Sequence, residues 1–151
     1  MIDVAVGSQA PVCLMHAQGT PDIMQDDPSY GDVVLDVYEY LADRVSTANR
    51  AGIPSSRITV DPGIGFGKTQ EHNLLLRKLS IFHSLGCAIL LGASRKRFIG
   101  AIGKAEVADQ RMPGSIAVAM AAVSQGVQVL RVHDVAETRQ ALSLHMAATS
   151  G

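Results

Sequence analysis

The chain has 151 residues, of which 47% are hydrophobic and 18% are charged, with 13 basic side chains against 14 acidic ones. This composition excludes a disordered segment and argues against a nucleic-acid partner, which calls for a basic excess. No apolar run approaches the ~18 to 20 residues of a membrane span, and the N-terminus lacks the basic start of a secretory signal. We therefore expect one cytoplasmic domain in which Cys13 and Cys87 are buried, reduced thiols.

Four short apolar runs alternate with longer segments of helical periodicity. The runs, which we expect to be strands, cover residues 11–15, 58–60, 88–91 and 127–132. After each run, apolar residues recur at every third or fourth position, which indicates a helix with one buried face. The four predicted faces are Val34, Val37, Leu41, Val45 and Ala48, then Leu75, Leu79, Phe82 and Leu85, then Ile116, Met120 and Val123, and last Val135, Leu142 and Met146. This alternation, without a hairpin signal, predicts a parallel α/β sheet.

Polar side chains follow all four predicted strands. They are His16 and Gln18, Asp61, Ser94 to Lys96, and Arg131, His133 and Asp134. Parallel strands place their carboxyl ends on one edge of the sheet, where α/β proteins bind their ligands. Polar residues kept only for stability would have little reason to gather at all four ends. The sequence therefore predicts a binding site at this edge.

The segment Asp61–Thr69 combines an acid at a strand end with three alternate glycines. It is not a nucleotide loop, because Pro62 stands where a Walker A motif needs glycine and Lys68 stands at the last position of a dinucleotide fingerprint. Two interpretations remain. Either the segment is a tight connection with a surface lysine, or its backbone approaches a ligand while Asp61 accepts hydrogen bonds from a flat, N–H-rich ring.

Two basic clusters follow the last two strands. The run Ser94–Arg97 is either a solvated turn or a site for an anionic substrate. Arg131 and His133 alternate, so they point to one side of the strand, where two donors suit a phosphate or diphosphate group. Asp134 with Glu137 resembles a capping box at the start of the last helix. The other histidines have no partner four residues away, so no metal ligand is assigned.

These segments together resemble the C-terminal half of the dihydropteroate synthases, the transferases of folate biosynthesis. The matching segments, in the family's order, are Cys13–His16, Gln18–Pro21 with Met24-Gln25, Asp61–Lys68, Ser94–Arg97 with Ile99-Gly100, Gly114-Ser115, and Arg131–Val135. The resemblance implies an α/β fold made of strands five to eight of a (β/α)₈ TIM barrel. Residues 1–151 would form a partial pterin-binding barrel domain whose N-terminal half is absent.

The resemblance also implies a reaction. The family condenses 6-hydroxymethyl-7,8-dihydropterin diphosphate with 4-aminobenzoate, which gives 7,8-dihydropteroate and diphosphate, and sulfonamide drugs compete for the aminobenzoate site. It further implies a homodimer and Mg²⁺, whose protein ligand would lie in the absent N-terminal half. No nucleic acid and no membrane is expected as a partner.

Residue roles carry over from the same resemblance. Asp61 would grip the pterin ring, Lys96 would contact the pterin, and Arg131 would lie over the pterin and bind the leaving diphosphate together with His133. These four are the implied catalytic residues. The implied substrate-binding residues are Met15 and Gly92 at the pterin, Phe66 and Ser94 near the aminobenzoate, and again Lys96 and Arg131.

The chain is short for a complete barrel, which leaves alternatives to an active transferase. A (β/α)₈ barrel takes about 250 residues, so we expect this chain to be a truncated form whose own activity is open. A half barrel leaves two open sheet edges, which favour aggregation unless they are covered. One alternative is therefore a non-catalytic half-barrel that pairs with a second copy or with an N-terminal partner. Another is a small four-stranded ligand-binding domain of unrelated function.

Overall fold

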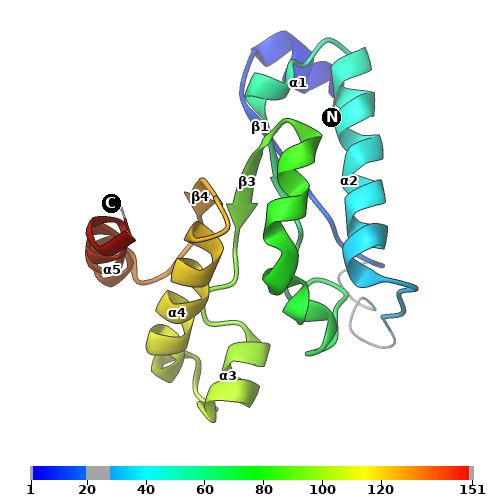
Figure 1. Cartoon of the computed structure of the whole chain (residues 1–151). Coiled ribbons are helices and arrows are strands. Elements are labelled where there is room, and N and C mark those ends of the chain that lie inside the picture. The colour runs from blue at the N-terminus through cyan, green and yellow to red at the C-terminus, as the bar shows by residue number, and fades with distance from the viewer. Residues whose placement is uncertain (1, 20–27, 150–151) are drawn as a thin grey trace.

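The computed structural model describes residues 2–19 and 28–149 (Figure 1). Its elements are α1 (Ile2–Ser8), β1 (Val12–Met15), α2 (Val33–Arg50), η1 (Ser55–Arg57), β2 (Ile58–Asp61), η2 (His72–Leu85), β3 (Ala88–Leu91), α3 (Arg97–Gly103), η3 (Ala108–Arg111), α4 (Met112–Val123), β4 (Val129–Leu130) and α5 (Val135–Thr149). Four of the motif residues named above, Thr20, Pro21, Met24 and Gln25, lie outside the described residues.

The four strands form one parallel sheet in the order β1-β2-β3-β4. Val12 lies opposite Ile58, Thr59 opposite Ala88, and Leu91 opposite Leu130. A doubly wound sheet reverses its strand order partway, whereas a barrel adds each new strand beside the last one. The consecutive order therefore confirms the predicted half of a (β/α)₈ barrel, with β1 and β4 at its edges.

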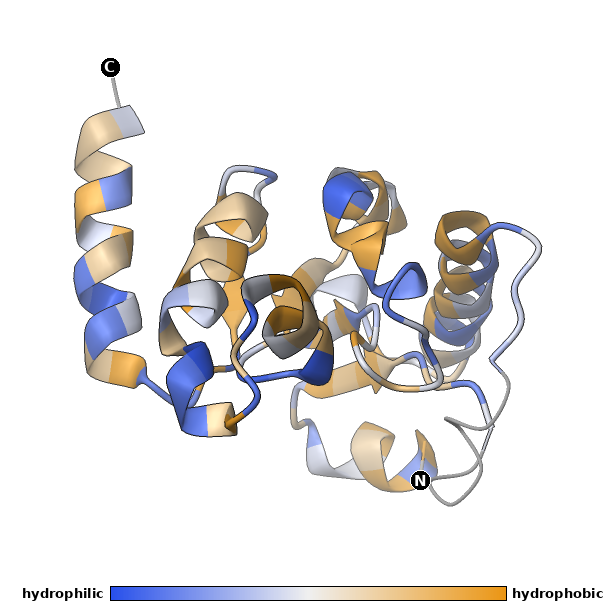
Figure 2. Ribbon diagram, turned by 90° about the horizontal axis from the view of Figure 1, so that it is seen from below, coloured by the Kyte–Doolittle hydropathy of each residue, from blue (hydrophilic) through white to orange (hydrophobic). Residues whose placement is uncertain are grey.

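The helices cover one face of this sheet. Alternate strand residues on that face, such as Val60 and Ile89, are fully buried. α2 contributes the apolar face predicted for it, and it begins at Asp32, whose side chain accepts hydrogen bonds from Val34 N and Leu35 N. α2 packs on β1 and η2, while η2 packs on β3. Figure 2 shows hydrophobic residues on the strands and a mixture of hydrophobic and hydrophilic residues along the helices.

The other face of the sheet is more open. Cys13, Thr59 and Leu90 point to it and are exposed or half-buried. The prediction of two buried thiols is therefore correct for Cys87 and wrong for Cys13, because Cys13 lies on this face of an edge strand. In a barrel this face forms the interior.

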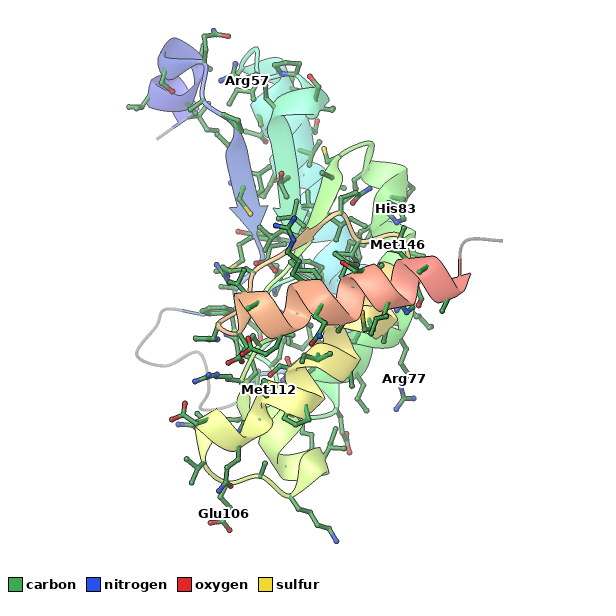
Figure 3. All side chains as sticks on the ribbon, turned by 90° about the vertical axis from the view of Figure 1, so that its left-hand side faces the viewer. Arg57, Arg77, His83, Glu106, Met112 and Met146 are labelled. Atoms are coloured by element: carbon green, nitrogen blue, oxygen red, sulfur yellow. The ribbon has the colours of Figure 1, made fainter. Side chains whose placement is uncertain are left out.

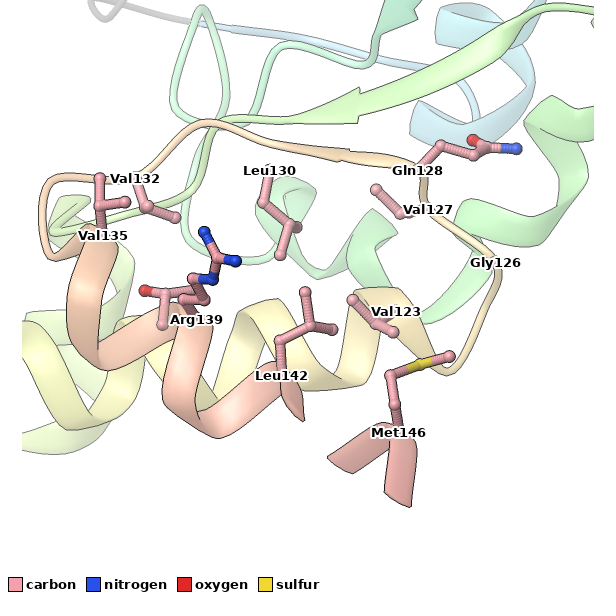
Figure 4. Close-up of a pocket in the computed structure, with 11 residues that line it drawn as sticks. Val123, Gly126, Val127, Gln128, Leu130, Val132, Val135, Arg139, Leu142 and Met146 are labelled. Carbon is pink, nitrogen blue, oxygen red and sulfur yellow. The ribbon is translucent and has the colours of Figure 1, made fainter. Parts of the chain in front are cut away.

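Two predicted helix faces need correction. In α4 the buried residues are Ser115, Ala119 and Ala122, one position away from the predicted larger side chains, because small residues allow close packing. In α5 only Thr138 is buried. Its predicted apolar face instead lines an open pocket of about 580 Å³ between α5 and the end of the sheet. Leu130, Leu142 and Val123 point toward one another there (Figure 4), and Figure 3 shows α5 lying over α4 at the side of the molecule.

Two short helices, α1 and α3, escaped prediction altogether. Each has only seven residues, which is too few for a periodic pattern to be recognised.

Candidate active site

Asp61 is the last residue of β2, and only 1% of it is exposed. Its Oδ1 accepts a hydrogen bond of 2.8 Å from Gly63 N, while its Oδ2 lies 3.7 Å from Arg131 Nη2. The second distance is too long for a hydrogen bond, so Oδ2 keeps lone pairs for a ligand. Burial raises the pKa of the Asp61 carboxyl, and the Gly63 N–H and the positive charge of Arg131 counteract this. The site thus holds a desolvated carboxylate facing a guanidinium.

The loop after Asp61 turns on glycines at which a Cβ would overlap the neighbouring backbone. Gly63 has φ +70°, and a Cβ there would lie 1.8 Å from the His16 carbonyl oxygen. Gly67 has φ +60°, and a Cβ there would lie 2.6 Å from the Gln18 carbonyl oxygen. The loop therefore lies directly against the segment that follows β1. The loop is thus not a plain surface turn, and the approach of its backbone to a ligand stays a prediction.

Lys68 is buried beneath this loop, with 3% of its surface exposed, so the expectation of a surface lysine is wrong. Its Nζ lies 2.9 Å from His16 Nδ1 and donates to the carbonyl oxygens of Gly63 and Phe66 at 3.1 and 3.2 Å. Three acceptors match the three protons of an ammonium group. A lysine after a glycine-rich turn looks exposed in sequence, and only the closure of the loop on His16 reveals its role.

The pKa values of Lys68 and His16 are both lowered, chiefly by burial. Burial lowers the pKa of Lys68 to about 7, with Asp61 counteracting. Burial, followed by the charge of Lys68, lowers the pKa of His16 to about 4. His16 is therefore neutral at pH 7, and in the tautomer that is protonated at Nε2 its Nδ1 can accept a hydrogen bond from Lys68 Nζ.

Lys68 should give the chain a distinctive pH dependence. The pKa of Lys68 is lowered in the folded state, so between pH 7 and about 10 the unfolded chain binds more protons, and stability rises with pH. In Lys68→Met this contribution vanishes, and its size in the wild type is up to about 3 kcal/mol over that window. Denaturant unfolding at pH 7 and 9.5 measures it, with Lys78→Met, at an exposed position, as the control. Equal pH dependence in wild type and Lys68→Met would contradict the assignment.

A cationic pocket of about 220 Å³ adjoins Asp61, lined by Gly92, Ser94, Lys96, Arg131, Val132 and His133. Arg131 and His133 share this pocket, as their alternation predicted. His133 Nδ1 lies 3.0 Å from Ser94 Oγ, and the His133 N–H donates to the same oxygen at 3.3 Å. A Cβ on Gly92 would lie 2.5 Å from Arg131 Nη2, so the bare backbone leaves room for the guanidinium.

Lys96 connects the pocket to the glycine loop. Its Nζ lies 3.9 Å from the centroid of the half-buried Phe66 ring, a cation–π contact. Burial and then the charge of Arg131 lower the pKa of Lys96, whereas Asp61 raises it. Met15 pairs in register with Asp61 at the end of β1. The structure thus places all the predicted site residues at the carboxyl ends of the strands.

The other two cations of the run 94–97 do not line this pocket. Arg95 pairs with Asp109 and Asp134, and Arg97 lines a different cavity of about 240 Å³. The predicted capping role of Asp134 is replaced by this pairing, because both its carboxylate oxygens accept from Arg95. Sequence reasoning also missed Asn73, whose Oδ1 accepts from Gly65 N at 2.6 Å.

The described part of the chain contains no group of three or more His, Cys, Asp or Glu side chains that could hold a metal ion. The pocket beside Asp61 is lined by Lys96, Arg131 and His133, and this basic lining does not fit a Mg²⁺ site on its own. No helix among residues 2–19 and 28–149 is both long and apolar enough to cross a bilayer.

The chain is similar to known proteins in sequence and in structure. The family of pterin binding enzymes matches residues 1–133. The dihydropteroate synthase of Escherichia coli K12 is 40% identical over 150 residues, which is 99% of this chain and 53% of that protein. Two solved structures are similar at 39% identity: dihydropteroate synthase of Yersinia pestis with a sulfonamide drug (TM-score 0.94, 99% and 54% covered) and of Xanthomonas albilineans with 7,8-dihydropteroate (TM-score 0.92, 99% and 55% covered). The chain spans about half the length of each.

Proposed function

The chain belongs to the family of pterin-binding enzymes, and from this premise we propose that it supplies the pterin and diphosphate side of a dihydropteroate synthase. The substrates would be 6-hydroxymethyl-7,8-dihydropterin diphosphate and 4-aminobenzoate. One observation carries the proposal: the buried Asp61 carboxylate faces Arg131 at 3.7 Å beside a pocket that also holds Lys96 and His133. An acceptor for a ring and donors for a diphosphate thus stand side by side.

Asp61 would bind the pterin. Its Oδ1 is fixed by the Gly63 N–H, so the carboxylate cannot rotate freely and Oδ2 is held toward the pocket. A carboxylate that is prepositioned in a water-poor site accepts ring N–H groups strongly and supports positive charge on the ring. Lys96, over the Phe66 ring, would contact the same ligand, and Met15 and Gly92 would line its pocket.

Arg131 and His133 would bind the diphosphate. The C–O bond breaks and its electron pair leaves with the diphosphate, while the amino nitrogen of 4-aminobenzoate forms a bond to the methylene carbon of the pterin. That nitrogen then loses one proton to water. Negative charge grows on the departing group, so cations aimed at it stabilise the transition state more than the ground state. Ser94, which holds His133 through its Oγ, would lie near the aminobenzoate with Phe66.

Several finer points belong to the same proposal. Mg²⁺ would be held by residues that this chain does not supply, and no step above passes through it. Sulfonamides would compete with 4-aminobenzoate. The protein would act in the cytoplasm as a homodimer.

A second candidate is a non-catalytic half-barrel that pairs with another copy or with a partner carrying the first strands. The open edges of β1 and β4 and the apolar pocket beside α5 favour it. Sedimentation equilibrium separates the cases, because a stable monomer would rule out obligate pairing.

The transferase proposal is tested by completing the barrel. A chimera that carries the N-terminal half of the Escherichia coli relative ahead of this chain should form 7,8-dihydropteroate from both substrates. A folded chimera without turnover would reject the proposal.

A further inference from the structure

We propose that Arg95 and Asp134 form a positioning pair. The pair fixes the positions of Lys96 and His133 relative to each other in the diphosphate pocket. The ligand named here rests on the proposed function, whereas the pairing itself is a property of the free chain. Arg95 would thus act through its neighbours and would not bind substrate itself.

The guanidinium of Arg95 and the carboxylate of Asp134 form a bidentate contact. Arg95 Nε lies 3.2 Å from Asp134 Oδ2, and Arg95 Nη2 lies 2.6 Å from Asp134 Oδ1. Two parallel bonds fix the angle between the groups as well as their distance, which a single ion pair does not. The pair is also shielded, since 25% of the Arg95 side chain and 15% of the Asp134 side chain are exposed.

The backbone at Arg95 is bent to make this contact. Arg95 has φ +58°, in the left-handed region that a residue with a side chain seldom adopts. Its N–H donates to Ser115 Oγ at 2.9 Å, and its carbonyl accepts from Arg111 Nη1 at 3.0 Å. Backbone strain of this kind persists only where the surroundings fix it.

The bend separates the directions of three consecutive side chains. Ser94 reaches His133, Arg95 reaches Asp134, and Lys96 reaches the Phe66 ring. Two adjacent contacts therefore join the loop after β3 to the loop after β4, and both loops present cations to one pocket. Loss of the contact between Arg95 and Asp134 should let Lys96 and His133 move relative to each other.

The chain offers a matched control. Asp109 also pairs with Arg95, but its side chain is 81% exposed, so solvent can replace it. Asp134→Asn and Asp109→Asn each remove one negative charge from the same arginine. Only the first should disturb the pocket.

Inorganic diphosphate is the probe, titrated into the chain and its variants by calorimetry. We expect about tenfold weaker binding in Asp134→Asn, unchanged binding in Asp109→Asn, and recovery of most of the affinity in Asp134→Glu, with similar unfolding midpoints throughout. Wild-type affinity in Asp134→Asn would overturn the proposal.

A second readout keeps the proposal separate from the choice of ligand. By NMR, Arg95 Nε–H should be protected from exchange in wild type and Asp109→Asn, and the amides of residues 94–96 and 133 should become more mobile in Asp134→Asn. If wild type bound no diphosphate, the proposed function would fail and these spectra would still decide the pairing. Unchanged protection and mobility in Asp134→Asn would overturn it.

Discussion

Asp61→Ala is expected to abolish dihydropteroate formation in the completed barrel, with a loss of about 10³-fold or more in kcat/KM. Asp61 is the only described carboxylate that faces both Arg131 and Lys96 in this site, and it is held there by Gly63 N. Its removal takes away the acceptor for the pterin and leaves the two cations without their counter-charge. Turnover is measured by release of diphosphate and by product chromatography.

The controls for Asp61→Ala come from the same chain. Asp43→Ala removes a carboxylate on the outer helix α2, where 62% of the side chain is exposed, and should leave turnover unchanged. Arg131→Ala should also lose turnover, because one of the two side chains proposed to bind the diphosphate is then missing. Activity retained in Asp61→Ala would remove the carboxylate from the mechanism.

Gly63→Ala should destabilise the fold by about 4 kcal/mol or more, since a Cβ would overlap the His16 carbonyl and the backbone would have to move. Gly86→Ala isolates the cost of the backbone angle. Gly86 has the same φ of +70°, yet a Cβ there would meet no atom within 4 Å, so only about 1 to 2 kcal/mol is expected. Urea unfolding of both variants measures the difference.

The two variants separate the cost of steric overlap from the cost of a positive φ in a residue with a side chain. A larger loss in Gly63→Ala than in Gly86→Ala means that the glycine loop must touch the segment after β1. Equal losses would mean that the loop can move away from His16 at no cost, and the loop would then not fix the position of Asp61.

The fold was predictable because strands and amphipathic helices leave periodic patterns. The face of α2 followed from its spacing, and the parallel direction of the strands followed from the absence of hairpin signals, whereas the barrel order came from the family resemblance. The pattern fails in α4, where alanines and Ser115 form the buried stripe, since hydropathy alone does not reveal close packing. It fails for Cys13 because which face of a strand is covered depends on elements elsewhere in the chain.

The site was predictable in part. The alternation of Arg131 and His133 correctly placed both in one pocket. Lys68 and the Arg95–Asp134 pair could not be found this way, because each depends on contacts between segments far apart in sequence. Asn73 could not be found because its contact with Gly65 forms only when the glycine loop closes. Charged residues at strand ends indicate that a site exists. Which residue each of them contacts depends on how the loops close.

The most direct test of the central claim is calorimetric titration of the chain itself with 6-hydroxymethyl-7,8-dihydropterin diphosphate. If the chain carries the pterin and diphosphate side of the site, wild type should bind with one-to-one stoichiometry, and Asp61→Ala should lose about tenfold or more in affinity. Absence of binding by folded wild type, or equal binding by Asp61→Ala, would contradict the account.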